Sequence, residues 1–120
     1  MLKILIDQWQ DQDTKEADLL ICDDNIAFIA YCSHYEDIER KSITLLSLYA
    51  SDIYLTDKKT NIQKNQDGGF YSYDIIAQVV NLSPPCVKLT EKINIELDSP
   101  IPKDIQVGQT VIFNVEKLNL

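Results

Sequence analysis

Apolar and polar residues alternate with a period of two along much of the chain, which is the pattern of β-strands that bury one face. Residues 93–97 and 111–115 show this alternation most clearly, and residues 87–89 repeat it. We expect residues 87–89 and 93–97 to pair as a hairpin around Thr90-Glu91-Lys92, because that register places all of the apolar side chains on one face. These apolar positions are Val87, Leu89, Ile93, Ile95 and Leu97.

Two further hairpins are predicted in the first half of the chain. Residues 18–22 and 26–32 are separated by Asp23-Asp24-Asn25, whose short polar side chains tolerate the left-handed backbone of a tight turn. Residues 44–49 and 53–56 are predicted to form the other hairpin.

The remaining segments differ in polarity. Residues 70–82 are apolar on both faces, which favours a central strand covered on both sides. Residues 57–69 are polar and are expected to form a loop. Residues 34–42 place acids before bases, an order that suits a helix dipole and favours a short helix. Gly108 can supply the positive φ of a turn before the last strand.

Together these segments predict a single, mainly β domain over residues 1–120. We expect a small curled antiparallel sheet or an OB-like barrel of about six to eight strands, with one short helix near residues 34–42. The closing run 104–113 resembles the last strand pair of an OB-like barrel in its glycine and its alternation. No residue's role is carried over from this resemblance.

Composition adds an expectation about the compartment. Hydrophobic residues make up 45% of the 120 residues, enough for a core without metal or disulfide staples. The sequence shows neither a secretory leader nor an apolar run of the roughly 20 residues that span a membrane. The three cysteines have no paired spacing. These features predict a cytoplasmic protein with reduced thiols.

Charge is the strongest functional signal. Residues 1–40 contain ten acidic and three basic side chains, a balance of −7, whereas residues 41–120 contain nine and eight, a balance of −1. Such a field attracts basic surfaces and repels nucleic-acid phosphates and anionic membranes. We therefore expect a basic protein partner, and neither nucleic acid nor a membrane. The candidate partner-binding residues are Asp11, Asp13, Glu16, Asp18, Asp23, Asp24, Glu36 and Asp37.

Two interpretations compete at several of these positions. Trp9 and Tyr35 are candidate aromatic anchors of the interface, although we favour Trp9 as an anchor of the N-terminal strand in the core. The negative charge itself would also arise if its only role were solubility. Its concentration in one third of the chain favours binding.

Known catalytic and metal-binding patterns are incomplete. The spacing Cys32-x-His34-x-Glu36 contains three types of zinc ligand, but no fourth ligand lies at a suitable distance along the chain. Asp11-x-Asp13 lacks the glycine and the final acid of a calcium-binding loop. We therefore expect no metal, no cofactor and no catalysis.

These observations predict a non-enzymatic acidic module that binds another protein, as an immunity protein or antitoxin inhibits a basic toxin such as a nuclease. One alternative is a small enzyme or ligand-binding barrel that uses a pocket near Cys32, His34 and Tyr71. A second alternative is a homo-oligomer in which an open sheet edge, residues 2–7 or 111–118, pairs with its copy.

Overall fold

A computed structural model describes all 120 residues, and every regular element in it is a β-strand. The strands are β1 (Lys3–Asp11), β2 (Glu16–Asp23), β3 (Ile26–Cys32), β4 (Ile43–Leu48), β5 (Tyr54–Leu55), β6 (Asn61–Lys64), β7 (Tyr73–Leu82), β8 (Pro85–Thr90), β9 (Ile93–Glu96), β10 (Thr110–Val115) and β11 (Lys117–Asn119). No helix of the length and apolarity needed to cross a membrane is present.

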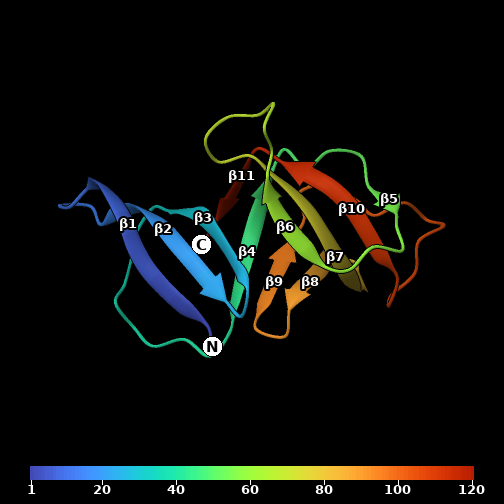
Figure 1. The fold of residues 1–120 in the computed structure, drawn as a ribbon, viewed down its shortest axis with the longest axis horizontal. Coiled ribbons are helices and arrows are strands. Elements are labelled where there is room, and N and C mark those ends of the chain that lie inside the picture. Colours follow the sequence, from blue (N-terminus) through green and yellow to red (C-terminus); the bar gives the residue numbers. More distant parts are fainter.

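All eleven strands belong to one open, mixed sheet with the order β1-β2-β3-β11-β4-β9-β8-β7-β10-β5, and β6 pairs with β7 (Figure 1). The pairs β3–β11 and β4–β9 are parallel, and the other pairs are antiparallel. The prediction of a mainly β protein is therefore confirmed. The predictions of a wholly antiparallel sheet, of about six to eight strands and of a closed OB-like barrel are wrong.

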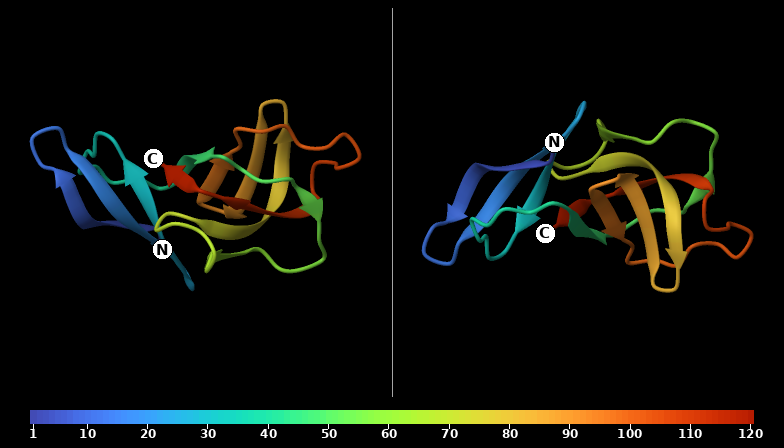
Figure 2. Two further views of the ribbon diagram at one scale, coloured as in Figure 1. Left: turned by 90° about the horizontal axis from the view of Figure 1, so that it is seen from above. Right: turned by 90° about the horizontal axis from the view of Figure 1, so that it is seen from below.

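The sheet curls because of how the last two strands are connected. Strands β10 and β11 follow each other with only Glu116 between them, yet β10 pairs with β7 whereas β11 pairs with β3 and β4. The path from β11 through β4, β9, β8 and β7 to β10 must therefore bend back towards its own start (Figure 2).

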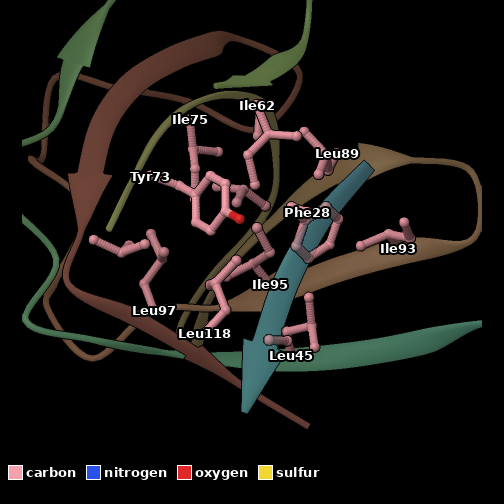
Figure 3. Close-up of a cluster of buried hydrophobic side chains, with 14 of the residues drawn as sticks. Phe28, Leu45, Ile62, Tyr73, Ile75, Leu89, Ile93, Ile95, Leu97 and Leu118 are labelled. Carbon is pink, nitrogen blue, oxygen red and sulfur yellow. The ribbon is translucent and has the colours of Figure 1, made fainter. Parts of the chain in front are cut away.

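The hydrophobic core lies inside this bend and contains 25 buried residues in one cluster. Its side chains converge from strands across the whole path, as Figure 3 shows for Leu45, Ile75 and Leu118. Phe28 of β3 joins the same core, with its ring 6.1 Å from that of Tyr73 in an edge-on arrangement. The β1–β3 part of the sheet and the curl therefore share one core.

Two of the three predicted hairpins and the turn predicted at Gly108 are confirmed. Strand β2 pairs with β3 and β8 pairs with β9, with Val87 opposite Ile95. The five apolar side chains predicted to share the buried face of the second hairpin are each at most 5% exposed. Asp24 takes a φ of 51° in the β2–β3 turn, and Gly108 takes a φ of 95° before β10.

The predicted helix near residues 34–42 is absent, and the segment between β3 and β4 is irregular. It is held at its two ends by different turns. The Tyr35 N–H donates to the carbonyl of Lys15 in the β1–β2 turn, and the Ile43 N–H donates to the carbonyl of Lys92 in the β8–β9 turn, both at 2.8 Å. The segment runs back along the β1–β3 lobe between these two points (Figure 1). A helix rises only about 1.5 Å per residue, so the same number of residues spans a longer distance between these two points as an irregular chain than as a helix.

The predicted hairpin of residues 44–49 and 53–56 is also wrong, because β4 pairs with β9 and β11 whereas β5 pairs with β10. Asp98 redirects the chain at this point. Its carboxylate accepts hydrogen bonds from the hydroxyl of Ser47 at 2.7 Å and from the N–H groups of Tyr49 and Ala50 at 2.6 and 3.1 Å. Tyr49 is thereby held at a φ of 55°, and the chain leaves β4 towards β10.

Two other segments differ from their predictions in detail. The expected loop 57–69 contains β6, whose Ile62 is 7% exposed and belongs to the core. Strand β7 is central, since it pairs with β6, β8 and β10, but it begins at Tyr73. Only one of its faces is buried, because Ile76 is half-buried and Val80 is exposed on the other face.

We predict that Asp98→Asn lowers the free energy of unfolding at pH 7 by on the order of 1 kcal/mol, a modest amount because the carboxylate is partly exposed. Burial alone would raise the pKa of Asp98, but the hydrogen bonds from Ser47, Ala50 and Tyr49 outweigh it and lower the pKa below its ordinary 3.8. A carboxyl group whose pKa is lowered in the folded state stabilises the protein at pH values above its ordinary pKa. This stabilisation is lost as the pH falls through the lowered pKa of the folded state.

Urea unfolding between pH 7 and pH 3 measures this effect. The difference between wild type and Asp98→Asn should shrink towards the acid end, whereas Asp104→Asn, at an exposed position without side-chain partners, should match wild type throughout. A difference that is equal at both ends of the range would contradict the prediction.

Candidate functional site

The excess of acidic side chains is concentrated in space as well as in sequence. Residues 1–40 form the three strands β1, β2 and β3 and most of the irregular segment that follows them. These elements make one lobe at one end of the molecule (Figure 1). Because residues 1–40 carry the balance of −7, we call this part the acidic lobe.

The predicted binding residues do not form one continuous patch. Asp11, Asp13 and Glu16 lie at the β1–β2 connection, whereas Asp23 and Asp24 lie at the β2–β3 turn. Strand β2 between them is eight residues long, which separates the two groups by about 25 Å. The structure therefore divides the acids between the two ends of the lobe.

The β1–β2 connection presents its acids on an ordered turn. The carboxylate of Asp11 accepts hydrogen bonds from the N–H groups of Asp13 at 2.9 Å and Thr14 at 3.4 Å. Lys15 completes the turn with a φ of 65°. The side chains of Asp11 and Asp13 are exposed, and that of Glu16 is half-buried.

The segment after β3 braces this turn from the side. The Tyr35 N–H donates to the carbonyl of Lys15 at 2.8 Å, and Nδ1 of His34 lies 3.1 Å from the carbonyl oxygen of Thr14. These contacts bring the exposed Glu36, the next residue along the chain, beside the β1–β2 connection. Three acids of β1–β2 and one of the following segment thus meet at this end of the lobe.

Trp9 and Tyr35 pack between the β1–β2 end of the lobe and the hydrophobic core. Their rings lie 6.3 Å apart in an edge-on arrangement, and both pack against the core. The ammonium of Lys15 lies 5.7 Å from the centre of the Trp9 ring. Asp37 and Tyr35 line the same cleft, and burial, followed by the charge of Asp37, raises the pKa of Tyr35. Trp9 therefore anchors the strand, as the sequence favoured.

Asp18 is 1% exposed, and its carboxylate is occupied inside the protein. The hydroxyl of Tyr71 donates to one oxygen at 2.6 Å, and Nε2 of Gln10 donates to the other at 2.8 Å. Burial and the hydrogen bond to Asp18 raise the pKa of Tyr71 to about 12. Asp18 thus links the acidic lobe to the connection between β6 and β7, which carries Tyr71.

This connection is held in place by Lys64, which the sequence assigned to an exposed loop. The ammonium of Lys64 donates to the carbonyls of Asn65 at 3.2 Å, Ser72 at 3.1 Å and Gly69. Gly68 is packed so closely that a Cβ there would lie 2.4 Å from the Cβ of Ser72. The loop is therefore ordered and sets the position of Tyr71.

An aromatic pair beside Asp18 holds a lysine that the sequence analysis missed. The rings of Tyr31 and Tyr71 lie 6.5 Å apart, and the ammonium of Lys117 lies 3.7 Å and 5.0 Å from their centres. The nearby carboxylate of Glu16, followed by partial burial, raises the pKa of Tyr31 to about 12. No local pattern in the sequence indicates that Lys117 meets Tyr31, because their contact depends on the pairing of β11 with β3.

Asp23 is likewise buried, at 3% exposed. It accepts a hydrogen bond from the Thr90 hydroxyl at 2.7 Å, and the N-terminal ammonium of Met1 lies 3.5 Å from its carboxylate. The neighbouring Asp24 is exposed and lies 3.6 Å from the same ammonium. Asp18 and Asp23 therefore stabilise the lobe, and the other six predicted residues remain at least partly accessible.

The alternative pocket near Cys32, His34 and Tyr71 does not form. Cys32 is buried opposite Ala17 in the β2–β3 ladder, whereas Tyr71 bonds to Asp18 on the other face of the same strands. His34 is exposed beyond the end of β3. No group of three His, Cys, Asp or Glu side chains is placed to hold a metal ion.

A cleft of about 890 Å³ lies between the β5–β6 segment and the outer face of β7 and β10. Its charged lining residues are two acids and two bases: Asp52, Lys58, Lys59 and Asp74. The charges balance, so the cleft favours neither an anionic nor a cationic ligand.

Comparison of the chain with known proteins finds no match: no family model, no curated protein and no solved structure. Its function is therefore argued from the geometry and charge of the chain itself.

We predict that Tyr71→Phe removes one tyrosine ionisation near pH 12. Because the folded pKa of Tyr71 lies above its ordinary value of 10.0, its contribution to stability is present below pH 10 and is lost as the pH rises towards 12. The substitution should also lower the free energy of unfolding at pH 7 by about 1–3 kcal/mol, since buried Asp18 loses a donor.

Absorbance at 295 nm during alkaline titration, together with urea unfolding at pH 7, measures both effects. Tyr49→Phe is the matched control, because Tyr49 is 72% exposed and its hydroxyl has no partner. If Tyr71→Phe and Tyr49→Phe behave alike in both measurements, the assigned role of Tyr71 is wrong.

Proposed function

We propose that this protein is a non-enzymatic module that binds a basic protein through the exposed acids at the β1–β2 end of its acidic lobe. We call this surface the acidic hairpin end, and it comprises Asp11, Asp13, Glu16 and Glu36. The observation that carries the proposal is that nearly all of the excess negative charge lies in one lobe. Charge needed only for solubility has no reason to gather there.

The geometry of the acidic hairpin end suits recognition. Its turn is fixed by the hydrogen bonds of Asp11 and braced by His34 and Tyr35. A surface that is already ordered loses little conformational freedom on binding. Its negative field also steers a basic partner towards it and raises the association rate, most strongly at low ionic strength.

The chemical class of partner follows from the same charges. A nuclease binds phosphate groups through a basic cleft, and a set of ordered carboxylates can occupy such a cleft in place of the phosphates. The proposal is therefore an inhibitor of the immunity or antitoxin type, whose target is a basic enzyme that acts on nucleic acid.

Asp18 and Asp23 are left out of the proposed contact because both are buried and bonded within the protein. Asp24 lies at the far end of the lobe, and Asp37 lies further along the irregular segment. These two exposed acids contribute to the overall field of the lobe, whereas the acidic hairpin end makes the direct contact.

The test compares two variants that each lose four negative charges. The first, D11N/D13N/E16Q/E36Q, neutralises the acidic hairpin end, and the matched control, D57N/D67N/D104N/E116Q, neutralises exposed acids outside the lobe. Proteins captured from the native lysate by the wild type are purified, and their affinity is measured by calorimetry. We expect a basic partner whose affinity falls roughly 100-fold in the first variant and changes little in the control.

The same experiment has two further readouts. The affinity of the wild type should fall as salt rises, because the contact is electrostatic. The captured enzyme should lose activity on nucleic acid when the wild type is added. A partner that is not basic, or equal loss of affinity in both variants, would contradict the proposal.

A further inference from the structure

Strand β1 is the longest strand of the sheet with an unpaired edge. It pairs with β2 on one side, and no other backbone hydrogen bond reaches residues 3–11. At the other end of the sheet, β5 is only two residues long. An unpaired edge presents N–H and C=O groups that can form a ladder with another strand. Figure 1 shows β1 at the outer side of the acidic lobe.

The side chains on this edge are self-complementary. Residues 3–7 have the sequence Lys-Ile-Leu-Ile-Asp. When two copies pair antiparallel about Leu5, Lys3 of each copy lies opposite Asp7 of the other, and Ile4 lies opposite Ile6. Opposite charges and apolar side chains that face each other across strands stabilise such a ladder. Neither Lys3 nor Asp7 has an ion-pair partner within its own chain.

We propose that β1 pairs with β1 of a second copy about a two-fold axis at Leu5, so that the sheet continues from one subunit into the other. A two-fold contact requires the same surface on both subunits, and the Lys3–Asp7 pattern meets this requirement. The parallel arrangement of the two strands would place Lys3 opposite Lys3 and Asp7 opposite Asp7, which like-charge repulsion disfavours.

Both faces beside the edge offer apolar surface to the second strand. A cleft of about 470 Å³ lies between Ile4 of β1 and the segment that carries Tyr35 and Ile38. It is on the side of the sheet to which Ile4 and Ile6 point, so it can receive the isoleucines of the second copy. On the other face Leu5 is 52% exposed, and Leu20 lies opposite it in the β1–β2 ladder.

The structure also limits the length of this pairing. Irregularities in β1 fall between Ile6 and Gln8 and again between Trp9 and Asp11. The first of them leaves Asp7 without a partner residue in β2. Such bulges interrupt a ladder and bend the edge away from a partner, so the regular part of the contact covers residues 3–6 and Asp7 lies at its end. Interfaces of less than about 1,000 Å² are weak, so we expect a dissociation constant in the micromolar range or above.

Salt separates this self-association from the proposed binding of a basic protein. Two acidic lobes approach each other in the dimer and repel at long range. Added salt screens this repulsion, so the dimer should strengthen as salt rises, whereas the basic partner should bind more weakly. Failure of one proposal therefore leaves the other intact.

The decisive experiment exchanges the two charges and follows the dimer by sedimentation equilibrium at protein concentrations up to about 1 mM. K3E alone places two acidic side chains opposite each other across the ladder, and D7K alone places two basic side chains there. Each should weaken the dimer at least tenfold. An equal mixture of the two variants should form heterodimers, and the double variant K3E/D7K should recover the wild-type constant.

Two comparisons separate strand pairing from the effects of net charge and of an added lysine. D7K lowers the net negative charge, so it would associate more strongly than wild type if overall repulsion alone decided the outcome. Leu5→Lys should abolish the dimer, whereas Leu46→Lys, at a position 51% exposed on β4, should leave it unchanged. Circular dichroism verifies that each variant is folded.

Two results would overturn the inference. One is a wild type that stays monomeric up to about 1 mM at both low and high salt. The other is a pair of single variants, K3E and D7K, that each dimerise as the wild type does.

Discussion

The direct connection between the last two strands, β10 and β11, is the constraint on which the rest of the fold depends. Strand β10 closes the curl against β7, and after Glu116 the chain continues as β11 between β3 and β4. The β3–β11 pair is thus the only strand pairing that joins the acidic lobe to the curl. Leu118 of β11 is fully buried in the shared core, so the lobe and the curl are held together by the same burial of apolar surface that stabilises each of them.

The acidic side chains fall into two physical classes that the charge count cannot separate. A buried carboxylate is tolerated only when hydrogen bonds replace its lost water, and Asp18 and Asp23 receive theirs from Tyr71 and Thr90. These donors lie far along the chain, Tyr71 in the β6–β7 connection and Thr90 at the end of β8, so the two buried acids position the lobe against the rest of the protein. The exposed acids Asp11 and Asp24 make only local contacts, with the N–H groups of Asp13 and Thr14 and with the Met1 ammonium, and their carboxylates remain open to solvent.

Features of the fold that are set by residues close together in the sequence could be predicted, whereas features set by residues far apart in the sequence could not. The β2–β3 and β8–β9 hairpins were predictable because alternation and turn residues are local signals. The parallel pairing of β3 with β11 and of β4 with β9 has no such signal, and neither has β6, which contributes one core side chain, Ile62. The chain turns away after β4 because Asp98 binds Tyr49, 49 positions earlier. The concentration of acids in residues 1–40 was likewise visible in the composition, but which of these acids are buried depends on Tyr71 and Thr90.

The two buried acids also determine how the lobe can move. Asp18 and Asp23 lie towards opposite ends of β2; Asp18 is bonded to Tyr71 in the β6–β7 connection and Asp23 to Thr90 at the end of β8. The pairing of β3 with β11 would by itself permit the lobe to rotate relative to the curl about this pair of strands. The hydrogen bonds of Asp18 with Tyr71 and of Asp23 with Thr90 oppose this rotation. These hydrogen bonds restrict how the lobe can turn relative to the curl, so in the proposed complex its carboxylates would be presented in one orientation.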